Sequence, residues 1–115
     1  MMTKPGDWKI EAMPNETENF YCGRNLTPQD YSKISSGLKP SSMDDKWFIY
    51  SQEESIHFHR SWTGHCIFIA RVEKKGDEIF LGEVTVNKHP EQFGAQDIEV
   101  KKGMFEKLVD LVLRK

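Results

Sequence analysis

The residues with the greatest chemical potential lie in one short stretch near the middle of the chain. The sequence there reads His57-Phe58-His59-Arg60-Ser61-Trp62-Thr63-Gly64-His65-Cys66. It holds three of the four histidines of the chain, together with a guanidinium, hydroxyl groups and a thiol. Such groups can bind a metal ion, bind an anion, or act as nucleophile and base. Which of these they do depends on the directions in which the backbone points them.

The guanidinium of Arg60 favours a binding site for an anion. It is a planar set of donors that matches a phosphate or a carboxylate. Hydroxyl groups beside it can add hydrogen bonds, and the neighbouring indole rings can stack on a flat ligand. We therefore expect a binding module for an anionic small molecule or a protein partner, with these ligand-binding residues: Arg60, Trp62, His59, Thr63 and Trp47.

A structural ion pair is the competing interpretation of Arg60. A cation among apolar neighbours must be paired or must line a cavity. Its acidic partner could be Glu83, Asp44 or Asp45. The surroundings of this one guanidinium therefore decide between a binding site and a structural pair.

The histidines raise the alternative of a zinc site. His57 and His59 are two apart on an expected strand, so they point the same way and could bind one Zn²⁺, with His65 or Cys66 as a further ligand. Residues 65 and 66 point to opposite faces of a regular strand, so without a bulge only one of them could take part. The chain has no Cys-x-x-Cys and no His-Glu-x-x-His motif. We therefore assign no metal and no cofactor, and keep an enzyme that uses His57, His59 and His65, with or without zinc, as the alternative function.

Nucleophilic catalysis is disfavoured by the same geometry. Cys66 stands beside His65, but sequence neighbours on a strand point away from each other. The residues around Ser61 do not form a Gly-x-Ser-x-Gly elbow. We assign no catalytic residue and expect a binding protein rather than an enzyme.

Four segments have the composition and alternation of β-strands, and they must position these groups. Short polar connections rich in turn-forming residues separate them, which is typical of an antiparallel meander. In the second segment we expect Arg60 and Trp62 on one face and His57 and His59 on the other; in the third, Cys66 shares a face with Phe68. The segments are 47–50, 56–62, 65–72 and 78–87.

Helical signals appear at both ends of this sheet. Apolar residues recur every three or four positions over 101–114, which predicts an amphipathic helix, although Gly103 should weaken its first turn. Thr27 and Pro28 predict the start of a short helix that Gly37 ends. The rest of 1–46 is poor in apolar residues, and we expect an irregular segment that wraps the sheet, with 8–12 as a short strand or an extended arm.

The charge balance disfavours nucleic acid as a partner. Sixteen basic residues stand against eighteen acidic ones, giving a net charge of −2 and a pI near 6.1. The pairs Lys74-Lys75 and Lys101-Lys102 are most simply solvated.

The remaining composition indicates a cytoplasmic setting. No apolar run is long enough to span a membrane, and no apolar stretch follows the charge near the N-terminus. We therefore expect neither a membrane segment nor a signal peptide. The two cysteines, Cys22 and Cys66, lie far apart in the sequence and are expected to be free and reduced.

Two strings of the sequence carry a resemblance. Trp47-Phe48-Ile49-Tyr50, followed by Phe58-His59-Arg60-Ser61-Trp62-Thr63-Gly64, resembles a signature of a family of small uncharacterised bacterial proteins. The resemblance covers about residues 43–88. It implies a bacterial, cytoplasmic setting and carries no activity with it.

The sequence therefore predicts one α+β domain over 1–115. Its parts are an irregular N-terminal segment (1–46) with one short helix, a four-stranded antiparallel meander (47–87), and a C-terminal helix (101–114) packed on one sheet face. Both faces of the strands carry apolar side chains. The second face must be covered by residues 1–46, by a partner, or by a second copy in a homodimer.

Overall fold

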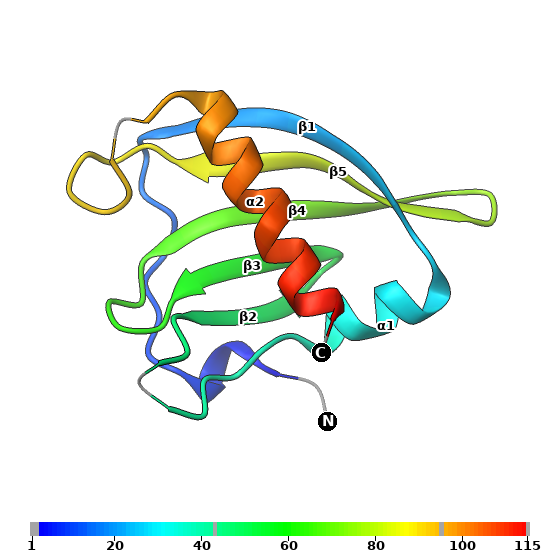
Figure 1. Cartoon of the computed structure of the whole chain (residues 1–115), viewed down its shortest axis with the longest axis horizontal. Helices are drawn as coiled ribbons and strands as arrows, with labels where there is room; N and C mark the ends of the chain where they lie inside the picture. Colours follow the sequence, from blue (N-terminus) through cyan, green and yellow to red (C-terminus); the bar gives the residue numbers. More distant parts are fainter. Residues whose placement is uncertain (1–2, 43, 95, 115) are drawn as a thin grey trace.

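A five-stranded antiparallel sheet forms the centre of the computed structural model, which describes residues 3–42, 44–94 and 96–114. The strand order is β1-β5-β4-β3-β2 (Figure 1). The α+β class and the meander of four consecutive strands are as predicted. The strands are β1 (Thr17–Leu26), β2 (Trp47–Gln52), β3 (Ser55–Arg60), β4 (Cys66–Lys75) and β5 (Glu78–Asn87).

The additional strand, β1, corrects the prediction that 1–46 is irregular apart from one short helix. β1 pairs with β5 from Thr17 opposite Asn87 to Leu26 opposite Ile79. Its own sequence contains Asn19 and Gly23, residue types that are depleted in strands, so local preference does not predict it. Pairing with a strand far along the chain supplies the hydrogen bonds instead.

Two α-helices of the described ranges accompany the sheet, and a short 3-10 helix, η1 (Pro5–Asp7), lies near the N-terminus. The first helix, α1 (Pro28–Ser36), begins and ends as predicted, because the side chain of Thr27 accepts a hydrogen bond from the backbone of Asp30 and Gly37 follows the last turn. The second, α2 (Ile98–Leu113), begins before the predicted residue 101. The carboxylate of Asp97 caps its start by accepting a hydrogen bond from the amide of Glu99. The helix therefore begins before Gly103 and continues through it.

The core lies between α2 and the sheet face that it crosses (Figure 1). Phe105 of α2 meets Phe58 and Phe68 edge to face, with ring centroids 5.4 and 5.2 Å apart. Lys101 also lies in this layer, 1% exposed, and corrects the prediction of a solvated lysine pair. Its ammonium is 3.2 Å from a carboxylate oxygen of Glu18 and 3.2 Å from the backbone oxygen of Asn87.

The N-terminal segment reaches the opposite sheet face. In Figure 1 it runs from η1, beside β2, past the ends of the strands to β1. Trp8 stacks on Phe48 at 6.1 Å and donates its indole hydrogen to the backbone oxygen of Ser61 at 2.8 Å. Residues 8–12 form no strand, so the extended arm is the form observed. Part of the second face is thus covered from within 1–46.

Within the described ranges, no helix has the length and apolar character needed to cross a membrane.

Candidate functional site

Strand β3, which the sequence predicts over 56–62, ends earlier than expected, and this changes the place of Trp62. β3 stops at Arg60, and a tight turn follows in which the amide of Gly64 donates to the backbone oxygen of Arg60 at 2.8 Å. Trp62 lies in this turn and is 69% exposed, so it does not share the strand face of Phe58. The side-chain oxygen of Thr63 accepts a hydrogen bond from the amide of His65 at 3.2 Å and helps to fix the turn.

The guanidinium of Arg60 lies over the indole of Trp47. The two residues are directly opposite each other in the pairing of β2 and β3, and the guanidinium carbon is 4.6 Å from the ring centroid. The flat cation covers a flat ring, a favourable geometry for both. Arg60 also lines a pocket.

That pocket, which we call the Arg60 pocket, has a volume of about 360 Å³. No carboxylate of the described chain forms an ion pair with Arg60, so Glu83, Asp44 and Asp45 are not the partners that the alternative interpretation needs. Glu83 lies on β5 opposite Tyr21 of β1, away from β3. The pocket is lined by Lys46, Arg60, Trp62, Thr63 and Gln92.

The electrostatics of this pocket favour an anion. Partial burial lowers the pKa of Arg60 from its ordinary 12.5, because leaving water disfavours the charged form. The guanidinium nevertheless keeps its proton at neutral pH. A second cation, Lys46, also lines the pocket, and none of the lining residues that the structure describes is acidic.

Two lining residues were not predicted. Lys46 directly precedes Trp47, and the register of the β2–β3 hairpin places it beside the turn: the amide of Ser61 donates to the Lys46 backbone oxygen at 2.9 Å. That register could have identified Lys46. Gln92 comes from the loop after β5, where its side-chain oxygen accepts a hydrogen bond from Asn87 at 2.8 Å. No local signal in the sequence connects Gln92 with Arg60.

His59, predicted as part of the same site, lies on the other sheet face. It is 1% exposed, and its Nδ1 is 2.9 Å from the backbone oxygen of Gly64. A carbonyl oxygen can only accept, so Nδ1 carries the proton and Nε2 carries a lone pair. The described structure contains no hydrogen-bond partner for this buried Nε2.

His57 and Tyr50 lie beside His59 on this face. The rings of His57 and Tyr50 stack at 4.7 Å with an interplanar angle of 3°, and Tyr50 stacks on His59 at 5.6 Å. Burial is the main cause that lowers the pKa of His57 to about 4, and burial also lowers the pKa of His59. Both imidazoles are therefore neutral at neutral pH.

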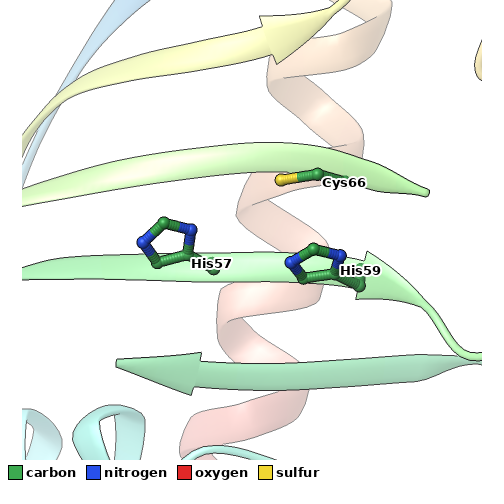
Figure 2. A group of neighbouring side chains, drawn as sticks. All are labelled: His57, His59 and Cys66. Atoms are coloured by element: carbon green, nitrogen blue, oxygen red, sulfur yellow. The ribbon is translucent and has the colours of Figure 1, made fainter. Parts of the chain in front are cut away.

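Cys66 joins these histidines through a β-bulge, and its predicted face is wrong. Phe58 is opposite Phe68, but His59 is opposite Cys66, so Ile67 has no partner and the alternation of β4 shifts at that point. The possible metal-binding atoms of His57, His59 and Cys66 all lie within 4.8 Å of one another. Figure 2 shows the three side chains on β3 and β4, with α2 behind the sheet.

The other predicted candidates for chemistry lie elsewhere. Nδ1 of His65 is 3.3 Å from a carboxylate oxygen of Glu11, without the angle of a hydrogen bond, and His65 is not in the cluster with His57 and His59. The hydroxyl of Ser61 donates to the backbone oxygen of Asp45 at 2.7 Å rather than to a base. Burial raises the pKa of the Cys66 thiol to about 12, so the free thiol is a poor nucleophile.

The chain matches no protein-family model, no curated protein and no solved structure. The two sides of β3 carry its candidate sites: the Arg60 pocket, and the cluster of His57, His59 and Cys66.

Proposed function

We propose that this protein binds a small anionic molecule, one with a phosphate or carboxylate group and a flat ring, in the Arg60 pocket. A single observation carries the proposal: a partly buried guanidinium that has no ion pair in the described chain lines an open pocket. A partly buried cation without an internal counter-ion costs free energy, and a bound anion offsets that cost.

The shape and lining of the pocket support a small ligand. Its volume of about 360 Å³ lies near the lower end of the range usual for small-molecule sites. Arg60 and Lys46 provide positive charge for the anionic group. The exposed ring of Trp62 provides a flat surface at the rim for a ring of the ligand.

The arrangement around Arg60 favours recognition over catalysis. Trp47 fixes the plane of the guanidinium, so less freedom is lost when the fork of donors meets a phosphate or carboxylate. The hydroxyl of Thr63 uses its oxygen to accept from His65, which leaves its hydrogen for a ligand. Among the described residues, the lining contains no carboxylate, thiol or imidazole that could serve as a base or nucleophile.

Titration calorimetry against phosphate, adenosine monophosphate and benzoate tests the proposal. Removing a charge-assisted hydrogen bond costs about 1.5–3 kcal/mol, so the Arg60→Gln variant should bind the best ligand roughly 10- to 150-fold more weakly. The matched control is Arg71→Gln, which removes an exposed arginine from β4. Equal binding by the wild type and Arg60→Gln would refute the site, as would no binding of any probe at millimolar concentration; the latter result would favour a protein partner.

A further inference from the structure

The cluster of His57, His59 and Cys66 lies on the sheet face opposite the core and plays no part in the Arg60 pocket. Ring stacking on Tyr50 explains how the two imidazoles are held, but it uses their faces rather than their nitrogen lone pairs. The hydrogen-bonding capacity of the buried nitrogen of His59 is thus unused by the described chain.

His59 is oriented as metal-binding histidines are. Such a histidine donates the hydrogen of one ring nitrogen to a carbonyl or carboxylate, which fixes the tautomer and directs the lone pair of the other nitrogen toward the ion. Here Nδ1 donates to the backbone oxygen of Gly64 at 2.9 Å, and the free atom is Nε2. Gly64 in turn is held by the amide of Glu11, which donates to the same oxygen at 2.9 Å.

The bulge at Ile67 brings in the third side chain. In a regular strand Cys66 would share the core face of Phe68, but the shifted register turns its thiol toward His59. A bulge leaves one residue of the strand without backbone pairing and changes the direction of a side chain, and bulges are frequent beside functional sites. Their effect here is to add a sulfur atom to two nitrogen atoms.

We propose that His57, His59 and Cys66 form a site for one Zn²⁺ ion. Two imidazoles and one thiolate are a donor set that suits this ion. Tetrahedral zinc, with bonds of about 2.0–2.3 Å, holds its donor atoms roughly 3.3–3.8 Å apart. The three atoms, all within 4.8 Å of one another, reach that spacing by small rotations of their side chains.

The surroundings provide access and a fourth position. A pocket of about 380 Å³ adjoins the three side chains, so an ion reaches them without unfolding of the sheet. Three protein ligands leave the fourth coordination position to water or to a small ligand in this pocket. Besides the cluster, the pocket is lined by Ile10, Glu11, Ala12, Met13, Tyr50 and Ile69.

Binding involves a definite proton balance. The thiol of Cys66 loses its proton as the sulfur–zinc bond forms, and both imidazoles bind through lone pairs that are already free at neutral pH. One proton is therefore released for each Zn²⁺ bound. This release is measurable by calorimetry in buffers of different ionisation enthalpy.

Cobalt titration of the full chain tests the proposal. Co²⁺ in a tetrahedral site with one thiolate gives a sulfur-to-metal charge-transfer band and intense visible bands, and we expect these at one equivalent, abolished by added Zn²⁺. Cys66→Ser should remove the charge-transfer band and weaken metal binding. Loss of a residue that only supports a metal ligand weakens binding roughly 10- to 100-fold, and loss of the ligand itself should weaken it more. Two control variants should leave the charge-transfer band and the affinity unchanged: Cys22→Ser, which removes the other thiol, and His65→Gln.

A measurement on the wild type guards against a variant that fails to fold. On addition of Zn²⁺, the Nε2 resonance of His59 and one ring-nitrogen resonance of His57 should shift in long-range nitrogen–proton spectra, while those of His65 and His89 stay in place. Absence of the charge-transfer band in the wild type, its persistence in Cys66→Ser, or shifts at His65 and His89 alone would overturn the proposal.

Discussion

The backbone oxygen of Gly64 accepts a hydrogen bond from Nδ1 of His59 at 2.9 Å. Gly64 belongs to the turn that carries Trp62 and Thr63 to the Arg60 pocket, and His59 points into the opposite sheet face. One peptide group therefore sets the position of both proposed binding regions. The same group also receives the amide of Glu11 from the N-terminal arm.

Substitution of this glycine should destabilise the protein. Gly64 has φ +81°, and a Cβ there would lie 2.7 Å from the backbone oxygen of Lys9. We expect Gly64→Ala to lower the free energy of unfolding by about 1–3 kcal/mol, measured by urea denaturation. Gly76→Ala is the control, because it has a similar φ of +60° with nothing within 4 Å of the added carbon. Equal losses in the two variants would show that contact with the arm contributes nothing.

The proposed ligand site predicts that Arg60 is not needed for folding. Arg60→Met should change the free energy of unfolding by no more than about 0.5 kcal/mol, because the loss of about 0.5–1 kcal/mol from the contact with Trp47 is offset by removal of a partly buried charge. Denaturation in urea measures this. A loss of several times that size, typical of a broken buried interaction, would mean that Arg60 has a structural role.

Lys101 should behave in the opposite way. Lys101→Met keeps the apolar stem but leaves the carboxylate of Glu18 without its partner at 3.2 Å. Breaking a buried ion pair costs about 3–5 kcal/mol; Glu18 keeps part of its hydration, so we expect a loss of roughly 2 kcal/mol. The double variant with Glu18→Gln should recover part of this loss. No recovery in the double variant would show that the carboxylate left without a partner is not what destabilises Lys101→Met.

Acid should destabilise the metal-free protein. His57 has a pKa of about 4 in the folded state against 6.5 when unfolded, and the pKa of His59 is lowered as well. Between these values the unfolded chain binds more protons, so stability is complete above pH 6.5 and is lost as the pH falls toward 4.

Urea midpoints at pH 7 and pH 5, with a chelator present, measure this loss. Of the groups facing these rings, Tyr50 and Cys66 stay neutral in this range, and the carboxylate of Glu11 lies beside His65. His57→Phe should reduce the difference between the two midpoints. A wild-type midpoint that is the same at both pH values would contradict the burial of both imidazoles.

The two thiols should react at very different rates. Cys66 is 1% exposed with a pKa of about 12. At a given pH it therefore has roughly 1000-fold fewer thiolates than a thiol with the ordinary pKa of 9.0. Cys22 is only partly buried, although burial raises the pKa of its thiol as well. Labelling at pH 8 with a disulfide reagent should therefore modify Cys22 first, and the Cys22→Ser variant, whose remaining thiol is Cys66, should react far more slowly. Rapid labelling of Cys22→Ser would contradict this.

Local patterns predicted the elements that local interactions determine. The hairpin of β2 and β3 follows from two apolar runs around a short polar turn, and α1 follows from the Thr27 cap, Pro28 and Gly37. In each case the residues that decide the structure are within a few positions of one another. The proximity of Arg60, Trp62 and Trp47 follows from the same hairpin.

Features that depend on distant partners were not predictable. β1 exists because β5 pairs with it, and Gln92 reaches the Arg60 pocket because Asn87 holds its loop. Strict alternation does not reveal the bulge at Ile67, and it therefore predicts the wrong sheet face for Cys66. The burial of the Lys101 ammonium in the core is likewise not predictable from local sequence, because it depends on Glu18 of β1, which lies beside it only in the folded sheet.

The pairing of β1 with β5 has a consequence for the order in which the molecule is built. During synthesis β1 leaves the ribosome long before β5, its neighbour in the sheet, so it stays unpaired while the hairpin of β2 and β3 can already close. Closing such a distant pair carries a large loop entropy and slows folding. A permuted chain that starts at β2 and joins β1 after α2 would release both strands close together in time, and it should fold faster than the natural order.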